Sequence, residues 1–210
     1  MGSEPLTTRL LPAQDRGSIE EALAALHSGS LVAFPTDTVY GLGAALANPQ
    51  AIEGLFSVKG RDASKAVAVL VGDALAFAQV APAMGRMAGR LADRFWPGPL
   101  TLVVRRHPDL PASLSPLPTI GVRMPDHPVA LALLKRSGPL AVTSANLSGE
   151  PDATTAQEVL YQLGGRISLI LDGGRTPGGK PSTVVDCLGE EPVILRAGPL
   201  TYEQLIAALV

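Results

Sequence analysis

The chain has 210 residues, of which 46% are hydrophobic and 17% are charged, and its formal net charge at pH 7 is −2. This composition excludes a disordered chain and a uniformly basic nucleic-acid-binding protein, although it leaves room for a local basic pocket. The sequence shows neither an apolar run of about 18 residues nor a signal-peptide pattern, so we expect a cytoplasmic protein without membrane contact.

The predicted elements alternate between helices and strands along the chain. Ser18-Ile19-Glu20-Glu21 has the pattern of a capping box and predicts a helix from 18 to about 27. Asn48 followed by Pro49 predicts a helix that continues to about 58. Further helices are expected at 73–80, 82–95 and 128–136, and after the capping-box patterns at Thr155 and Thr201. Apolar runs predict strands at 30–34, 66–71, 100–105, 119–123, 140–143, 167–171, 182–187 and 193–196.

This alternation predicts an α/β fold in which helices pack on a twisted sheet. The last strands follow one another without an intervening helix, so the sheet is expected to mix parallel and antiparallel pairs. No internal repeat and no long linker divides the sequence, and residues 1–210 are therefore expected to form one domain.

Several familiar motifs are incomplete in this sequence. The segment 174–180, Gly-Arg-Thr-Pro-Gly-Gly-Lys, begins like a phosphate-binding P-loop, but Pro181 replaces the required Ser or Thr and a strand-like run follows. The three histidines lack ligand spacing, so no metal site is predicted on the chain itself. Cys187 is the only cysteine, which excludes a disulfide framework and a thiolate metal cluster.

Four polar clusters follow predicted strands or helices, where sites of open α/β sheets usually lie. They are the hydroxyl-rich segment 34–43, Lys59-Gly60-Arg61 with Lys65 nearby, Arg123, and the segment 143–146. Lys and Arg can meet a polyanion together, and Ser and Asn can hold a nucleotide by neutral hydrogen bonds. Each cluster alone is more often a solvated turn or cap, whereas their co-occurrence favours a nucleotide site.

Seven short motifs follow one another along the chain. They are Thr36-Asp37-Thr38-Val39-Tyr40-Gly41-Leu42, Lys59-Gly60-Arg61, Trp96-Pro97-Gly98-Pro99-Leu100-Thr101, Val122-Arg123-Met124-Pro125, Thr143-Ser144-Ala145-Asn146, Ser182-Thr183-Val184-Val185-Asp186 and Leu195-Arg196-Ala197-Gly198. Their order resembles that of the TsaC/YrdC family, from about residue 18 to 202.

The resemblance implies an α/β sheet around a concave, positive cleft. It also implies condensation of L-threonine, bicarbonate and ATP to threonylcarbamoyl-AMP, with release of pyrophosphate and with Mg²⁺ bound through the ATP phosphates. A separate transferase complex would then place the threonylcarbamoyl group on tRNA, and direct contact of this chain with tRNA is not required.

The resemblance also implies the roles of individual residues. The predicted catalytic residues, which would hold the ATP phosphates, are Lys59, Arg61, Ser144 and Asn146. Further ATP contacts are predicted at Lys65, Thr119 and Arg196. Threonine-binding residues are predicted at Thr36, Arg123, Thr143 and Ser182, with Arg123 as the partner of the threonine carboxylate.

The sequence departs from the family pattern at three positions. Asp62 and Ala197 replace frequent prolines, and Leu70 stands where some members have His, which removes one expected threonine contact. Two alternatives remain at this point: carbamoyl-adenylate chemistry, as in the related domain of hydrogenase-maturation proteins, and a non-enzymatic RNA-binding function of the same cleft.

Overall fold

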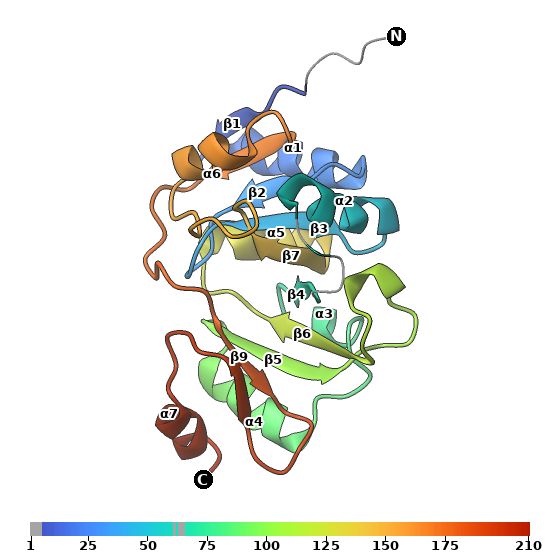
Figure 1. Ribbon diagram of the computed structural model, residues 1–210, viewed down its shortest axis with the longest axis vertical. Helices are drawn as coiled ribbons and strands as arrows, with labels where there is room; N and C mark the ends of the chain where they lie inside the picture. The colour runs from blue at the N-terminus through green and yellow to red at the C-terminus, as the bar shows by residue number, and fades with distance from the viewer. Residues whose placement is uncertain (1–5, 61, 63–65) are drawn as a thin grey trace.

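The computed structural model describes residues 6–60, 62 and 66–210 (Figure 1). The predicted site residues Arg61 and Lys65 lie outside the described residues. Within the described part of the chain, ten strands form one sheet in the order β1-β8-β2-β3-β7-β4-β6-β5-β9-β10. No helix of this part is both long enough and apolar enough to span a bilayer.

The elements follow the predicted alternation closely. The strands are β1 Arg9–Pro12, β2 Val32–Phe34, β3 Gly41–Ala45, β4 Ala68–Leu70, β5 Leu100–Arg105, β6 Thr119–Arg123, β7 Leu140–Ser144, β8 Leu169–Asp172, β9 Thr183–Asp186 and β10 Val193–Arg196. The helices are α1 Arg16–His27, α2 Pro49–Lys59, α3 Ala74–Phe77, α4 Arg86–Phe95, α5 Pro128–Ser137, α6 Ala156–Leu163 and α7 Tyr202–Ala207, with a short 3₁₀ helix at Ala112–Leu114.

The sheet mixes both kinds of pairing, as the sequence predicts. Parallel pairs join β1 to β8, β8 to β2, β4 to β6 and β5 to β9. Antiparallel pairs join β2 to β3, β3 to β7, β7 to β4, β6 to β5 and β9 to β10. The prediction underestimated the antiparallel part, which occupies the centre of the sheet as well as its C-terminal edge.

Two hydrophobic cores lie against the sheet. Side chains of α1 and α5, including Leu26 and Leu133, pack with Phe34 and Val142 in one core. Side chains of α2, α3, α4 and α6 form the larger second core with strand residues such as Val69. Both groups of helices therefore bury their apolar sides against the strands, and this packing holds the central strands in place.

The helix starts test the predicted caps. The Thr155 and Thr201 side chains each accept a backbone N–H while the residue three positions later returns the bond, so both capping boxes are confirmed. Asn48 also caps α2 through a 3.0 Å bond from the Ala51 N–H. The capping box at Ser18 is wrong, because a turn closed by Asp15 starts α1 at Arg16 and buries Ser18 inside the helix.

The connection between β8 and β9, residues 173–182, runs along one side of the molecule from the upper to the lower half of the sheet (Figure 1). Gly174 and Gly179 adopt positive φ angles, and no helix follows, so this segment is a loop and not a P-loop. The Tyr40 hydroxyl donates a 2.7 Å hydrogen bond to the Gly174 carbonyl and accepts one from the Gly173 N–H. Burial raises the pKa of Tyr40 to about 12, so the hydroxyl remains a donor at neutral pH.

We expect Tyr40→Phe to lower the free energy of unfolding by about 1–3 kcal/mol, because the Gly174 carbonyl loses its donor next to a buried ring. Urea denaturation of the variant measures this change. Tyr161→Phe is the matched control, since Tyr161 is 93% exposed and its hydroxyl reaches solvent. Equal stabilities of the two variants would contradict the role given to Tyr40.

Candidate functional site

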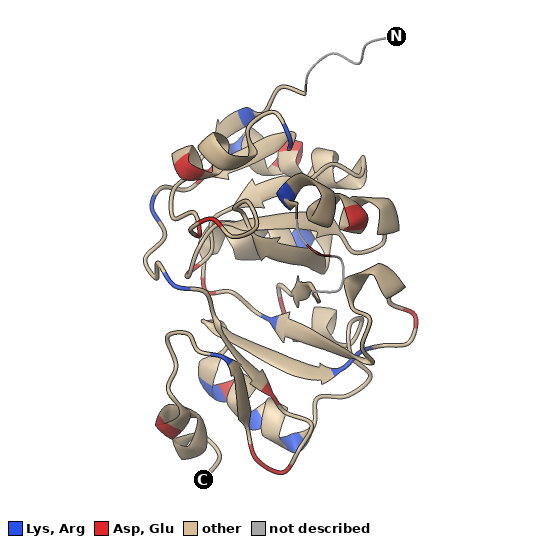
Figure 2. Ribbon diagram, in the orientation of Figure 1, with Lys and Arg blue, Asp and Glu red and all other residues tan. Residues whose placement is uncertain are grey.

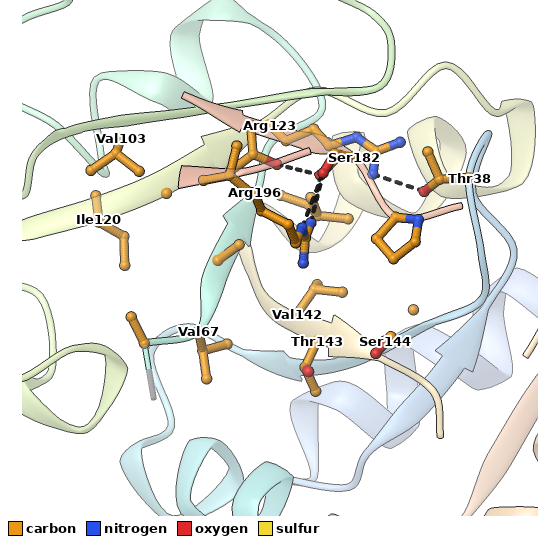
Figure 3. A pocket seen from close by; sticks show the side chains of 18 of the residues that line it. Thr38, Val67, Val103, Ile120, Arg123, Val142, Thr143, Ser144, Ser182 and Arg196 are labelled. Carbon is orange, nitrogen blue, oxygen red and sulfur yellow. Dashed lines mark hydrogen bonds between the residues drawn. The ribbon is translucent and has the colours of Figure 1, made fainter. Parts of the chain in front are cut away.

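A cavity of about 330 Å³ opens where the strand ends of the central sheet meet the connection between β8 and β9. This volume lies at the lower end of the range for small-molecule sites. Residues with a small side chain or none, among them Gly41, Ala68 and Gly121, form part of its lining. Hydroxyl groups and two guanidinium groups form the polar part of its wall (Figure 3).

Arg123 stands at the end of β6, and each of its three guanidinium nitrogens donates a hydrogen bond to a residue outside this strand. Its Nε donates to the Gly98 carbonyl and its Nη1 to Thr38 Oγ1, both at 2.9 Å. Its Nη2 forms an ion pair with Asp37 Oδ1, which also accepts the Asp126 N–H. Arg123 thus ties the loop after β2 to the turn before β5.

This ion pair is nearly dry, with the Arg123 and Asp37 side chains 7% and 11% exposed. Burial lowers the pKa of Arg123 from its ordinary value, and the Asp37 carboxylate opposes that shift. The second Asp37 oxygen, Oδ2, is buried without a hydrogen-bond partner within the described residues. A buried charge of this kind is costly unless its partner stays in place, so Asp37 holds Arg123 in both position and charge state.

Thr36 and Thr38 form a directed chain of hydroxyl groups next to Arg123. The Thr36 hydroxyl donates to the Val39 carbonyl at 2.6 Å and accepts the Thr38 N–H at 3.2 Å. Its oxygen also lies 3.0 Å from Thr38 Oγ1, which accepts from Arg123. Since the Thr36 proton goes to Val39, Thr38 must be the donor in the bond between the two hydroxyl groups.

Ser182 and Arg196 form a second polar group next to Arg123, and Figure 3 shows Arg196 reaching into the cavity. Arg196 donates from Nε and Nη2 to the Ser182 carbonyl at 3.1 and 2.9 Å. The Ser182 hydroxyl accepts from Arg196 Nη2 at 3.0 Å and lies 2.7 Å from Thr101 Oγ1. A bulge in the β9–β10 pairing between Ile194 and Arg196 aims the arginine inward.

Lys59 lies at the end of α2 and is only 3% exposed. Its ammonium group donates to the carbonyls of Ser144 and Asn146 and, at 3.1 Å, to Asn146 Oδ1. Asn146 Oδ1 also accepts the Ser144 hydroxyl at 2.6 Å, and its amide donates to the carbonyls of Leu147 and Glu150. The hydrogen bonds of Lys59 and Asn146 therefore stabilise the turn after β7.

The structure brings most of the predicted site residues to one cavity. Those in its wall are Thr36, Thr119, Arg123, Thr143, Ser144, Ser182 and Arg196. Lys59 and Asn146 lie outside that wall as it is described, one hydrogen bond behind Ser144. Sequence reasoning assigned no role to Asp37, Thr38 or Thr101, although the first two stand inside the Thr-Asp-Thr motif.

Residues 24–198 match the Sua5/YciO/YrdC family model, whose description is "Telomere recombination". The chain belongs to this family. It is 44% identical over 194 residues to the threonylcarbamoyl-AMP synthase of Bacillus subtilis, which covers 91% of this chain and 56% of the relative. It is 41% identical over 199 residues to a Mycobacterium tuberculosis relative, which covers 94% of this chain and 92% of that protein.

The fold agrees with this family membership. The crystal structure of Pyrococcus abyssi Sua5 complexed with L-threonine has a TM-score of 0.91 and 38% sequence identity to the chain. The match covers 96% of this chain and 60% of Sua5. The chain thus spans somewhat more than half the length of the B. subtilis and P. abyssi proteins and nearly all of the mycobacterial one.

We expect Asp37→Asn to lower the free energy of unfolding by about 3 kcal/mol, because it leaves the Arg123 charge buried without a carboxylate. Guanidinium chloride denaturation measures the change. Glu20→Gln is the matched control, since it removes the carboxylate of the exposed Arg136–Glu20 pair and should leave the midpoint unchanged. Equal midpoints for both variants would show that the Asp37 charge has no structural role.

A double-mutant cycle tests whether Lys59 acts on the site through Asn146. We expect Lys59→Met and Asn146→Ala to destabilise the protein non-additively, with a coupling free energy of about 1 kcal/mol or more, because each removes the other's partner. The four unfolding curves of the cycle give this value. If the two destabilisations add within about 0.5 kcal/mol, Lys59 and Asn146 are not coupled.

Proposed function

We propose that this chain synthesises L-threonylcarbamoyl-AMP from L-threonine, bicarbonate or CO₂, and ATP, and releases pyrophosphate. The observation that carries the proposal is the cavity itself, in which a buried, oriented guanidinium stands among hydroxyl groups at the residues that the family motifs select. The B. subtilis relative bears the name of this activity, and P. abyssi Sua5 binds L-threonine in its crystal structure.

In this proposal the threonine lies against the polar part of the wall that Arg123, Thr143 and Ser182 share. Arg123 binds its carboxylate, because the contacts with Gly98, Thr38 and Asp37 use three of the five N–H groups that a guanidinium carries. Thr143 and Ser182 line the same cavity. In the proposal they contact the amino and hydroxyl groups of the substrate. Thr36 belongs to this part of the wall and completes the proposed threonine-binding set.

The nucleotide occupies the other part of the cavity. Thr119, Ser144 and Arg196 line it and contact ATP directly in the proposal. Lys59 and Asn146 hold Ser144 in place, and a direct bond from Lys59 to a phosphate requires its ammonium group to exchange one of its present acceptors. The proposal also keeps Arg61 and Lys65, outside the described residues, as phosphate contacts.

The chemistry needs positioning more than covalent participation of the protein. The threonine amine forms a C–N bond with CO₂, or with bicarbonate as water leaves, and loses a proton to give a carbamate. A carbamate oxygen then forms a bond to the α-phosphorus while the bond to pyrophosphate breaks. Correct orientation of the reactants can contribute about 7–11 kcal/mol to lowering such a barrier. Arg196 and Lys59 stabilise the negative charge that grows on the departing pyrophosphate.

Mg²⁺ fits this site as an ion held chiefly by the ATP phosphates. The described residues contain no cluster of three or more His, Cys, Asp or Glu side chains suited to a metal. The site offers neutral hydroxyl oxygens instead, such as Ser144 Oγ, and Mg²⁺ typically takes most of its ligands from phosphates and water. When bound, the ion supplies further neutralisation of phosphate charge.

The proposed product is a mixed anhydride, so a second enzyme must accept its threonylcarbamoyl group. We place this chain in the cytoplasm, upstream of a transferase complex that modifies tRNA. A direct RNA contact is not needed for this role, and Figure 2 shows acidic and basic residues interspersed in both halves of the molecule.

Omission of single substrates tests the proposed function. We expect the purified chain with ATP and Mg²⁺ to release pyrophosphate only when both L-threonine and bicarbonate are present, because the attacking group is the carbamate. A coupled pyrophosphate assay measures the release, and mass spectrometry identifies the adenylate. Release with neither substrate, or no release at all, would overturn the proposal. Activity with carbamoyl phosphate instead of threonine would support the hydrogenase-maturation type of chemistry.

A further inference from the structure

Three arginines follow one another along the exposed side of α4. Arg86, Arg90 and Arg94 are four residues apart, and all three are exposed. Four residues advance an α-helix by about 6 Å and slightly more than one turn, so the three side chains form a row on one side of the helix. Figure 2 shows basic positions along α4 in the lower half of the molecule. We name Arg86, Arg90 and Arg94 the arginine row.

The arginine row lies behind the sheet as seen from the cavity. Side chains alternate between the two faces along β5, and Thr101 and Val103 line the cavity. The residues between them, Leu100 and Leu102, are fully buried in the larger core together with Leu91 of α4. Since α4 covers the face of the sheet opposite to the cavity, a partner bound to the row would leave the cavity open to substrates.

The folding of α4 does not account for this row. Other arginines, such as Arg9 and Arg136, form ion pairs with carboxylates, whereas no ion pair among the described residues includes a member of the row. Like charges at four-residue spacing destabilise a helix. Arg86 is also the first residue of α4, where the helix dipole disfavours a cation, and Gly85 supplies no side-chain cap. We therefore look for a ligand that would explain the three charges.

Gly89 on the same side of α4 is equally unexplained by packing. A Cβ atom at this position would have no neighbouring segment within 4 Å, so the fold does not require a glycine there. Glycine within a helix is less stable than alanine, because it loses more backbone entropy on folding. Its missing side chain allows another backbone to approach α4 closely next to Arg86 and Arg90.

Two members of the row are already held by contacts within the protein. Arg90 Nη1 donates a hydrogen bond to the Leu209 carbonyl, and the Arg94 guanidinium lies 5.5 Å from the centre of the Phe95 ring. A guanidinium carries five N–H groups, so each of these side chains keeps donors for a ligand. Because the side chains are partly ordered in advance, binding an anion costs less conformational entropy.

Charge complementarity requires a partner with anionic groups about 6 Å apart along a line. Carboxylates at four-residue spacing on a second helix meet this requirement. The exposed carboxylate of Asp93 stands beside the row and would repel a nucleic-acid backbone, whereas a protein partner can place a basic side chain opposite it. Three cations also neutralise few phosphates, which gives weak binding to RNA at physiological salt.

We propose that the arginine row is a docking site for an acidic helix of a partner protein. The site is separate from the cavity, and the inference does not depend on the proposed function. Its binding partner is defined by carboxylates at four-residue spacing, which form ion pairs with Arg86, Arg90 and Arg94.

A helical alanine-based peptide with a glutamate at every fourth position tests the proposal on the full chain. We expect fluorescence anisotropy to show binding that weakens as the salt concentration rises. The variant Arg86→Gln/Arg90→Gln/Arg94→Gln should bind at least about tenfold more weakly, because each exposed ion pair contributes a factor of about 1.5–5. The same peptide with glutamine in place of glutamate should not bind.

Arg16→Gln/Arg136→Gln/Arg166→Gln is the matched control. It changes the net charge equally at exposed arginines of other elements and should bind the glutamate peptide like the unmodified chain. Equal losses in the two triple variants, or no binding by the unmodified chain at low salt, would overturn the inference. Binding of an RNA duplex but not of the glutamate peptide would also overturn it and assign the row to nucleic acid.

Two further measurements separate docking from folding and catalysis. Arg86→Gln should leave the free energy of unfolding unchanged or raise it, because a cation leaves the positive end of α4. A clear loss of stability would give the row a structural role and overturn the inference. Pyrophosphate release should be equal in the unmodified chain and in the triple variant of the row. A loss in that variant alone would overturn the inference, whereas no release by either would overturn the proposed function only.

Discussion

Arg123 places a positive charge inside the protein, where lost hydration must be offset by partners at short range. Those partners are the Asp37 carboxylate, the Thr38 hydroxyl and the Gly98 carbonyl, which come from two segments far apart in the sequence. The cavity wall therefore depends on this group. If the guanidinium left its place, the loop after β2 and the turn before β5 would lose their common contact.

Two glycine residues of the central strands contribute to the lining of the cavity. Gly41 and Gly121 lie on central strands, and each lacks the side chain that would otherwise contact a neighbour such as Val142 or Thr101. A strand interior normally disfavours glycine, because it loses more conformational entropy and packs less. The backbone pairing of these strands on both sides compensates for that weakness, and the missing side chains let Val142 and Thr101 pack close to the strand backbone.

The sequence predicted the elements whose signal is local. Apolar runs identified β5, β6 and β7, and cap chemistry located the starts of α2, α6 and α7. It missed β3, because Gly-Leu-Gly-Ala-Ala has low strand propensity and becomes a strand only between β2 and β7. It also missed β1, a short edge strand that ends in Pro12 and pairs with β8 alone.

Much of the candidate site could likewise be predicted, because its residues lie in motifs whose order resembles one family. The motifs could not say which atom of each side chain faces the ligand. Lys59 and Asn146 are 87 positions apart, so their mutual contact has no local signature.

Thr36 also shows that a motif does not reveal which atoms of a side chain remain available to a ligand. A hydroxyl residue in a site motif predicts polar recognition, but here the Val39 carbonyl, the Thr38 N–H and the Thr38 hydroxyl already use the Thr36 hydroxyl. The chemistry of a residue type sets what a side chain is able to do. The hydrogen bonds imposed by the fold then decide which of its groups remain available to a ligand.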